Sequence, residues 1–477
     1  MHSFIHIKGL GLAFPKTRCF EGFSAQIVPH SRIAIIGDNG AGKSSLLNIL
    51  RGTLLPTEGC FELPPDVRLG YVPQIIEQTP ALSGGQRFNQ HLSQVLATCP
   101  NVLLLDEPTN HLDQDNRNSL MRRLTAFHGT VIVISHDETL LNTCIDTLWH
   151  IEGQQVHQFS GQYDAYIRAR QQRVSALESE LSSLKRDKRR MHEALMREQK
   201  RAASSRMKGK KSINNKKWPT IVSHAKAHRA GMTAGKKQAA IDQSRQRLNE
   251  KLEDIQLPEK IIPQFSLTCE HRNHGGVLSI VQATVGYVDC PPVLTDVHLA
   301  VGSRERIVIQ GKNASGKSTL LKGILGTKGM CKSGIWDVPK AEHIGYLDQH
   351  YANLTACLSV FEQLKCIKPE WSDAEIRKHL NAFLFRGNDI VFCSVSTLSG
   401  GERVRLSLAV IAAQVPRLLI LDEITNNLDL TTKAHVTDVL AAYPGSLIVV
   451  SHDEAFVEAI CLDQYYEISA GTLKAMR

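Results

Sequence analysis

The most informative absence in this sequence is an absence of acid. The stretch "KRAASSRMKGKKSINNKKWPTIVSHAKAHRAGMTAGKK", Lys200 to Lys237, contains twelve Lys and Arg but no Asp or Glu. The whole chain of 477 residues has a formal net charge of only +9, so positive charge is concentrated here. We call Lys200 to Lys237 the basic segment. Because like charges repel one another unless a polyanion is close, the segment is either a solvated linker or a site for a phosphate-rich partner.

Other absences exclude whole classes of protein. No stretch approaches the roughly 18 to 20 apolar residues of a membrane span, and the N-terminal "MHSFIHIKGLGLAF" lacks the basic region and apolar block of a secretory signal. The eleven cysteines form no CxxC pair, so we expect reduced core residues and no metal or disulfide framework. With 42% hydrophobic residues, the chain can form two or three globular domains, and we expect a cytosolic protein.

An internal repeat organises the chain. "IAIIGDNGAGKSSLLNILRG" from Ile33 recurs as "IVIQGKNASGKSTLLKGILG" from Ile307. Four further pairs of blocks follow in the same order: "LGYVPQ" and "IGYLDQ", "LSGGQR" and "LSGGER", "LLLDEPTNHLD" and "LILDEITNNLD", "VIVISHDE" and "LIVVSHDE". The offset between copies is 274 residues at the first pair, 275 at Gln74 and Gln349, and 316 from the LSGG pair onward, so the first copy is shorter by about 41 residues after Gln74. We predict domains at residues 1–165 and 261–477 around a middle segment, 166–260.

The first pair of blocks has the pattern of a phosphate-binding loop, G-x4-G-K-S, between an apolar run and a Leu-rich helical pattern. Glycines let backbone N–H groups surround phosphates, and the helix N-terminus adds its dipole. The lysine is expected at the β and γ phosphates and the serine at Mg²⁺. The residues predicted to bind nucleotide here are Gly37, Asn39, Gly40, Gly42, Lys43, Ser44 and Ser45 in the first copy, and Gly311, Asn313, Gly316, Lys317, Ser318 and Thr319 in the second.

Paired carboxylates follow two predicted strands. "LLLDE" and "LILDE" are typical of buried parallel strands, since continuous apolar runs mark strands covered on both faces. We expect Asp106 and Asp422 to hold Mg²⁺ together with Ser44 and Ser318. Glu107 and Glu423 are then placed to polarise the attacking water as general bases. The predicted chemistry is nucleotide hydrolysis.

The "LSGGQ" and "LSGGE" blocks ahead of such strands resemble the signature of the ATP-binding cassette superfamily, and the resemblance covers about four-fifths of the chain. It implies an α/β fold of two cassettes that pack head to tail, each ATP lying between the phosphate loop of one and the signature of the other. One composite site would join Lys43 to the signature Ser399, Gly400 and Gly401. The other would join Lys317 to Ser83, Gly84 and Gly85.

The same resemblance implies roles for further residues, in pairs. The pairs are Gln74 and Gln349, sensing Mg²⁺ and the water; His136 and His452, contacting the γ-phosphate; Asp113 and Asp429, coupling the two sites; and Phe14 and Tyr287, stacking on adenine. The adenine match is the weakest of these, and a core aromatic is the alternative for both positions. No expected catalytic position is degenerate in either copy, so we expect both sites to hydrolyse ATP.

The middle segment predicts an antiparallel helical hairpin. A three-four spacing of mostly apolar residues indicates one long helix with a narrow apolar seam, at Val174, Leu177, Leu181, Leu184, Lys188, Met191 and Leu195. Ile241, Leu248, Leu252 and Ile255 indicate a returning helix that ends near Leu257-Pro258. The tip between them is expected where helix-interrupting residues gather, at Gly209, Asn214, Asn215, Pro219, Gly231 and Gly235. The segment holds 25 Lys and Arg against 10 Asp and Glu.

Tandem cassettes, no membrane domain and a basic helical linker resemble the ABC-F family of translation factors and ribosome-protection proteins. The resemblance implies that the linker enters the ribosomal exit (E) site, contacts ribosomal RNA and reaches the transfer RNA in the peptidyl (P) site. The sequence departs from many members at "YVPQIIEQTPALSGGQ", where only Ile75 to Ala81 stand in place of a helical subdomain. A short first cassette also occurs among resistance-type members.

Two function classes therefore stay open. The leading hypothesis is a monomeric, ribosome-bound ATPase that needs no membrane partner. The rival is a DNA-associated ATPase, because a basic hairpin would also hold branched or single-stranded DNA. Flexible basic ends with Asn, His and the aromatic Trp218 favour structured RNA over duplex grooves. A transporter motor is disfavoured, since the hairpin joins the two cassettes directly.

Overall fold

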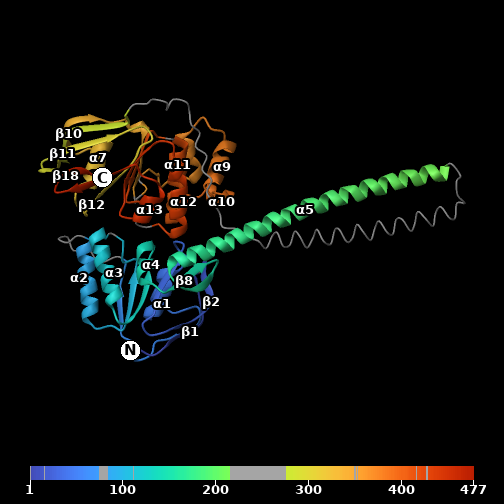
Figure 1. Ribbon diagram of the computed structural model, residues 1–477, viewed down its shortest axis with the longest axis horizontal. Helices are drawn as coiled ribbons and strands as arrows, with labels where there is room; N and C mark the ends of the chain where they lie inside the picture. The colour runs from blue at the N-terminus through green and yellow to red at the C-terminus, as the bar shows by residue number, and fades with distance from the viewer. Residues whose placement is uncertain are drawn as a thin grey trace. The chain divides into compact units, whose positions relative to one another are not determined.

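The computed structural model describes residues 2–14, 17–74, 84–110, 112–214, 276–348, 351, 353–414, 416–425 and 428–476. The chain divides into two compact units, one made of Met1–Asp164 with Lys260–Arg477 and the other of Ala165–Glu259. The first unit holds both copies of the internal repeat, and each copy has one six-stranded and one three-stranded sheet. Figure 1 labels the elements.

In the first copy, strands and helices alternate as the sequence predicts. Its described elements are β1 (Ile5–Phe14), β2 (Thr17–Ile27), β3 (Arg32–Gly37), α1 (Lys43–Arg51), β4 (Glu58–Glu62), β5 (Leu69–Val72), α2 (Gly84–Ala97), β6 (Val102–Asp106), α3 (Gln114–Ala126), β7 (Thr130–Ile134), α4 (Glu138–Cys144), β8 (Thr147–Glu152) and β9 (Gln155–Ser160).

The central sheet of the first copy has the strand order β5-β6-β7-β3-β8-β9. All neighbouring strands are parallel except β8 and β9. β6 and β7 are buried at every residue, because a parallel strand covered on both faces must be apolar throughout. The predicted buried parallel strand ahead of Glu107 is confirmed. Since parallel strands end at one edge of the sheet, β3, β6 and β7 deliver their following loops to a common place.

A second, antiparallel sheet with the order β2-β1-β4 packs against the first through α1. Its buried side chains, such as Leu10 and Phe20, share one apolar core with α1 and the central sheet. Trp149 of β8 meets Phe23 of β2 edge to face, with ring centroids 5.0 Å apart. The loop between β3 and α1 is thereby fixed on both sides by packed elements.

The second copy repeats this plan and adds helices. Its described elements are β10 (Leu278–Tyr287), β11 (Pro292–Val301), β12 (Arg306–Gly311), α7 (Lys317–Leu325), β13 (Met330–Asp337), η2 (Ala341–His343), β14 (Ile344–Asp348), α8 (Val360–Ile367), α9 (Asp373–Ala382), α10 (Asn388–Val391), η3 (Val395–Thr397), α11 (Gly400–Gln414), β15 (Leu418–Asp422), α12 (Leu430–Ala441), β16 (Ser446–Val450), α13 (Glu454–Ala459), β17 (Gln464–Ser469) and β18 (Thr472–Met476). Its sheets have the orders β14-β15-β16-β12-β17-β18 and β11-β10-β13.

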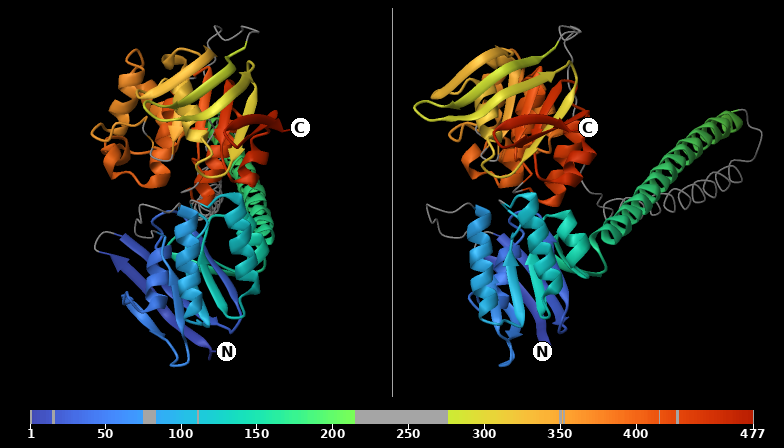
Figure 2. Two further views of the ribbon diagram at one scale, coloured as in Figure 1. Left: turned by 90° about the vertical axis from the view of Figure 1, so that its left-hand side faces the viewer. Right: turned by 60° about the vertical axis from the view of Figure 1, so that its left-hand side comes forward.

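Helices α8 to α10 occupy the stretch that the first copy lacks. They pack with α11 and α12 in one apolar core, and Figure 2 shows these orange helices on one side of the copy and the yellow antiparallel strands on the other. α8 and α9 each begin with a capping box, in which a serine and the glutamate three residues later satisfy the first backbone N–H groups. The start of each of these two helices is therefore encoded in a few consecutive residues.

The signature helices α2 and α11 differ in burial, because the first copy has no helical subdomain to cover α2. Leu406 and Val410 of α11 are fully buried, and the residues 316 positions earlier, Gln90 and Gln94 of α2, are exposed. α2 keeps only Phe88 and Leu92 as its fully buried large apolar side chains, on the face toward its own sheet. The first copy thus replaces the contact with a helical subdomain by contact with water.

The second unit contains most of α5 (Tyr163–Asn214), a single helix of 52 residues. Along it the seam residues Val174, Leu177 and Leu181 are half-buried and their neighbours mostly exposed, which confirms the long amphipathic helix. The expected interruption at Gly209 is wrong, because the helix continues to Asn214. The other predicted breakers beyond Asn214 and the returning helix lie outside the described residues. In the described part of the chain, no helix is both long and apolar enough to span a bilayer.

The cysteines differ from expectation. Of the ten that the structure describes, all are free thiols, but only Cys19 and Cys144 are buried and most are exposed. The prediction of reduced residues agrees with this, whereas the prediction of core residues is wrong.

Candidate nucleotide-binding sites

Glycine geometry shapes the loop between β3 and α1. Gly37, Gly40 and Gly42 have φ angles of 146°, 82° and 99°, which residues with a side chain rarely adopt. A Cβ on Gly37 would lie 2.6 Å from the carbonyl oxygen of Ile151, and one on Gly42 would lie 2.8 Å from Cβ of Cys19. The loop therefore needs glycine for both conformation and space, as a loop that wraps phosphates does.

The two loop lysines point back into their own loops. Lys43 Nζ donates to the carbonyl oxygens of Gly37 at 2.8 Å and Asp38 at 3.0 Å. Lys317 Nζ makes the matching bonds to Gly311 at 2.7 Å and Lys312 at 3.0 Å. Burial lowers the pKa of both lysines, with only 7% and 5% of their surface exposed. Each ammonium is thus held in a dry cradle, where a phosphate would gain more from it than in water.

Oxygen ligands for a divalent cation converge beside each lysine. Ser44 Oγ lies 3.3 Å from Asp106 Oδ1, and Ser318 hydrogen-bonds to Asp422 in the same way. Burial raises the pKa of both aspartates, so their ionised forms gain from a nearby cation. Hydroxyl and carboxylate oxygens are the ligands that Mg²⁺ prefers, and the residues present fit that ion. When bound, the ion would neutralise charge on the phosphates.

Each candidate catalytic glutamate stands where its strand turns away. Glu107 and Glu423 have φ angles of 48° and 51°, in the left-handed region. Their backbone N–H groups still donate to the neighbouring strands, to Ile134 at 2.9 Å and Val450 at 2.8 Å. Left-handed backbone at a residue with a side chain costs about 1 kcal/mol or more and gathers at functional sites. The turn directs both side chains to the strand edge where the phosphate loops lie.

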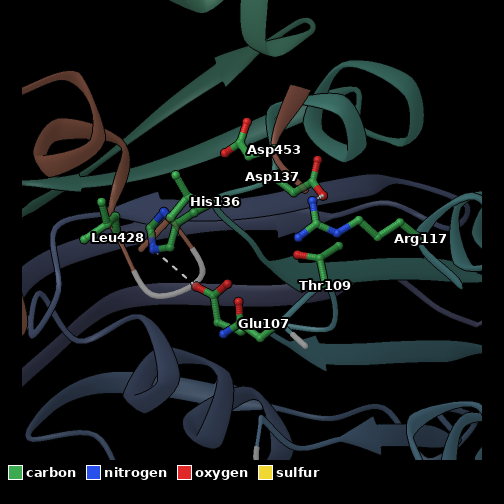
Figure 3. A pocket seen from close by; sticks show the side chains of 9 residues that line it. Glu107, Thr109, Arg117, His136, Asp137, Leu428 and Asp453 are labelled. Carbon is green, nitrogen blue, oxygen red and sulfur yellow. Dashed lines mark ion pairs between the residues drawn. The ribbon is translucent and has the colours of Figure 1, made fainter. Parts of the chain in front are cut away.

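The histidines face these glutamates at different distances. His136 Nε2 lies 3.2 Å from Glu107 Oε1, the pair joined in Figure 3, and His452 Nε2 lies 3.9 Å from Glu423 Oε1. Burial raises the pKa of Glu107 to about 8 and lowers that of His136 to about 3. Among the described residues, Nδ1 of His136 has no hydrogen-bond partner. A buried donor without an acceptor fits a ligand such as a γ-phosphate.

The signature glycines pack against the helix after the catalytic strand. A Cβ on Gly85 would lie 2.9 Å from Asn116 Nδ2, and one on Gly401 would lie 2.8 Å from Thr432 Oγ1. Gly84 and Gly400 begin α2 and α11. Ser399, just before α11, hydrogen-bonds to Glu402. Ser83 and Gln349 lie outside the described residues, so their expected places stay predictions.

Groups of the two copies meet at the first phosphate loop. The backbone N–H of Asn39 donates to Asp429 Oδ2 at 3.0 Å, and a Cβ on Gly400 would lie 3.8 Å from Asn39 Nδ2. At the second loop, Lys312 Nζ lies 2.7 Å from Asp115 Oδ2. The first loop thus adjoins the signature of the second copy, in the head-to-tail sense expected. Asp113 caps α3 through the backbone N–H of Asn116, and its charge acts on Lys312 and Lys317 of the second loop, while Asp115 forms the ion pair with Lys312.

The adenine-side aromatics are exposed. Phe14 is 48% exposed and lines an open pocket with Gln74, Asn39, Gly40, Lys43, Ser44 and Ser45. Tyr287 is 39% exposed, and Lys322 Nζ lies 5.7 Å from its ring centroid. The alternative of core aromatics is therefore wrong for both. The structure brings Phe14 and Gln74 to the phosphate loop, and their roles toward a nucleotide stay predictions.

Sequence reasoning missed two cations between the copies. Arg117 Nη1 donates to the backbone oxygen of His452 at 3.3 Å, and Lys433 Nζ donates to Glu138 Oε1 at 2.7 Å. Arg117 lines the pocket of Figure 3 together with Glu107, His136, Asp137 and Asp453. A signal was present, because Arg117 and Lys433 are 316 residues apart, the offset of the catalytic motifs. Charge kept at one position of both copies points to a shared role.

These features define a class of protein: two phosphate loops, two buried strands ending in Asp-Glu and two signature helices make a tandem ATP-binding cassette protein. Residues 20–74 and 294–426 match the family model described as ABC transporter. The probable ATP-binding protein YheS of Haemophilus influenzae is 30% identical, over 94% of this chain and 77% of its own length. The chain belongs to the ABC-F family of ATP-binding cassette proteins, as the tandem arrangement suggested.

Two further relatives have functional names. The ribosome protection protein VmlR of Bacillus subtilis is 29% identical, over 92% of this chain and 82% of its own length. The erythromycin resistance ATP-binding protein MsrA of Staphylococcus epidermidis is 28% identical, over 93% of both chains. Both likenesses span the cassettes and the segment between them.

Proposed function

We propose that this protein is an ATPase of the ribosome, which binds with two ATP molecules in place and leaves after hydrolysis. The observation that carries the ATPase is that one compact unit holds two phosphate-loop lysines, each beside a Ser–Asp pair and a glutamate. The phosphate loop of the first cassette already touches Asp429 of the second. The ribosome is supported by the two relatives named for ribosome protection and erythromycin resistance.

Each site would hydrolyse ATP by positioning and charge. At the first site Lys43 holds the β and γ phosphates, and Ser44 and Asp106 would bind Mg²⁺. Glu107 takes a proton from a water molecule while the oxygen of that water forms a bond to the γ phosphorus. The bond between the γ phosphorus and the β–γ bridging oxygen breaks, and ADP is released. His136 holds the γ-phosphate. Lys317, Ser318, Asp422, Glu423 and His452 take the same roles at the second site.

The nucleotide state would be sensed at the interface between cassettes. Ser399, Gly400 and Gly401 cover the ATP on Lys43, and Ser83, Gly84 and Gly85 cover the ATP on Lys317. Binding of ATP orders both interfaces together, and loss of the γ-phosphate frees them. Asp429, which caps α12 and contacts Asn39, links one site to the structure of the other.

The segment 166–260 would be the part that contacts RNA, between cassettes at 1–165 and 261–477. The separate compact unit Ala165–Glu259 and the charged helix α5 support this division. We propose that the segment enters the E site, contacts ribosomal RNA and carries the basic segment toward the P-site transfer RNA. Such binding would place the protein in the cytoplasm, as a monomer that needs no membrane partner, and could act in translation or in protection against ribosome-directed antibiotics.

A trapping experiment tests the proposal. Replacement of Glu107 and Glu423 by Gln removes both general bases but keeps the size and hydrogen bonding of the side chains. With ATP this variant should sediment with ribosomes, while the same variant with ADP should not. Branched DNA added at equal salt should fail to compete with ribosomes; effective competition would favour the DNA-associated alternative. Absence from ribosomes in ATP at low salt would overturn the ribosomal assignment and leave the ATPase.

A further inference from the structure

The signature serine of the second cassette is already engaged by a carboxylate. The backbone N–H of Ser399 donates to Glu402 Oε2 at 2.8 Å, and its hydroxyl donates to the same oxygen at 2.7 Å. The backbone N–H of Glu402 donates in return to Ser399 Oγ at 3.4 Å. Both donors that Ser399 can offer to an anion are therefore directed at one negatively charged oxygen.

This residue pair faces the first phosphate loop. Gly400, next to Ser399, is the position whose Cβ would lie 3.8 Å from Asn39 Nδ2, and Asn39 stands three residues before Gly42. On the proposed function, the γ-phosphate held by Lys43 must receive its hydrogen bond from Ser399. A carboxylate and a phosphate would then compete for the same hydroxyl, and their like charges repel.

The other signature differs at this one position. The residue 316 positions before Glu402 is Gln86, so "LSGGE" in the second cassette corresponds to "LSGGQ" in the first. A glutamine carries no charge, and its amide can accept from a serine with its oxygen while its NH₂ donates to a phosphate. The chain thus contains its own matched pair of a charged and a neutral signature.

We propose that Glu402 is a positioning residue that occupies the phosphate donors of Ser399, so that ATP enters the Lys43–Ser399 site in competition with it. The inference rests on the proposed function, since it assigns Ser399 to the γ-phosphate. ADP, which lacks that group, meets no such competitor. The Lys317–Ser83 site, completed by the neutral Gln86, discriminates less against ATP. The two sites therefore fill at different ATP concentrations, the Lys317 site first.

A helix-capping role for Glu402 does not by itself account for the proposed difference in ATP affinity between the two sites. Ser359 and Glu362 at the start of α8 make the same pattern, with Ser359 N and Oγ each 2.8 Å from Glu362 Oε2. That helix lies in the additional helical part of the second cassette, and neither residue is assigned to nucleotide. Glu362→Gln is therefore a matched control, because it weakens a capping box of the same geometry and leaves both signatures intact.

The experiment measures ATP and ADP affinity at one site at a time. The full-length protein carries Glu107→Gln and Glu423→Gln to prevent hydrolysis, with Lys317→Ala to leave the Lys43 site or Lys43→Ala to leave the Lys317 site. Fluorescent ATP and ADP analogues are titrated with Mg²⁺. In the first background, Glu402→Gln should tighten ATP about tenfold and leave ADP unchanged. In the second, Gln86→Glu should weaken ATP by a similar factor. Glu362→Gln should leave the ratio of ATP affinity to ADP affinity unchanged in both backgrounds.

Each outcome separates the inference from the proposed function. Equal shifts for ATP and ADP in Glu402→Gln, no shift at all, or the same shift in Glu362→Gln would overturn the inference while nucleotide binding itself stands. Failure of both backgrounds to bind ATP, with the fold intact by circular dichroism and wild type also not binding, would instead overturn the ATPase proposal on which it rests.

Discussion

Lys433 of the second cassette donates to Glu138 of the first, with 2.7 Å between Nζ and Oε1. Lys433 is only 6% exposed, and Asp453 of its own cassette lies 2.8 Å from the same ammonium. The neighbouring carboxylates raise the pKa of Lys433 against the effect of burial. Its counterpart Arg117 lies 3.6 Å from Asp137 and reaches the backbone of His452. Lys433 and Arg117 thus each connect the loop after β7, which carries His136, with the loop after β16, which carries His452.

Removal of the Lys433 charge should loosen the cassettes. Lys433→Met leaves Glu138 and Asp453 facing each other without a cation, and breaking such a pair costs about 2 kcal/mol or more. We expect a fall in the thermal midpoint of the nucleotide-free protein and lower ATPase activity. The control is Lys340→Met, which breaks the exposed pair with Glu342 and should cost well under about 1 kcal/mol. A loss in Lys433→Met no greater than in the control would contradict the assigned role.

Backbone strain in the second phosphate loop predicts a stabilising substitution. Ala314 has φ of 64°, and its counterpart 274 residues earlier is Gly40 with φ of 82°. Left-handed backbone costs a residue with a side chain about 1 kcal/mol relative to glycine. Ala314→Gly should therefore raise the thermal midpoint by about 2 °C. Gly40→Ala should lower it by a similar amount, because no atom lies within 4 Å of the added Cβ and only strain remains. A lower midpoint in Ala314→Gly would be the contrary result.

Acid should destabilise the fold through its two catalytic-loop histidines. Burial lowers the pKa of His136 to about 3 and that of His452 to about 4, below the value of about 6.5 for an unfolded chain. As pH falls from 7 to 5 the unfolded state binds two protons that the folded state does not, a loss of about 1–2 kcal/mol for each histidine. Buried carboxyls such as Glu107 oppose this trend, so the test compares the loss of stability in wild type with the loss in a variant that lacks both histidines.

The measured quantity is the change in thermal midpoint between pH 7 and pH 5, for wild type and for His136→Gln with His452→Gln. The variant takes up no proton at these positions in either state. We therefore expect it to lose less stability on acidification than wild type. An equal loss in both proteins would mean that these histidines are already protonated in the fold at pH 5.

The basic segment should act through its charge on a phosphate-rich partner. Lys216→Gln with Lys217→Gln should weaken ribosome binding and flatten its dependence on salt by about two units of log–log slope. The matched control is Arg189→Gln with Arg190→Gln on α5, whose side chains lie 3.3 Å from Glu193 and 3.7 Å from Asp187. Basal ATPase activity should stay near wild type in both variants. Equal slopes in the two variants would argue for a solvated linker.

Local patterns made most of the fold predictable. The strand-loop-helix around Lys43 and the apolar run before Glu107 are encoded in consecutive residues, and the repeat reproduces both in the second copy. The seam that begins at Val174 likewise predicts α5. The interruption expected at Gly209 failed because one glycine costs a helix only about 1 kcal/mol, which a long helix absorbs. The expected burial of the cysteines failed because composition does not say which face a residue takes.

The sequence by itself determined the chemistry at each position: where glycine-rich loops carry a lysine, which residues carry negative charge at the strand ends, and where positive charge has no acid beside it. Those properties belong to side chains and to short stretches of backbone. Only the tertiary structure decided which groups meet across the two cassettes, such as Asn39 with Asp429 and Lys433 with Glu138. Contacts between residues hundreds of positions apart depend on how two sheets and their helices pack, and no local pattern specifies that geometry.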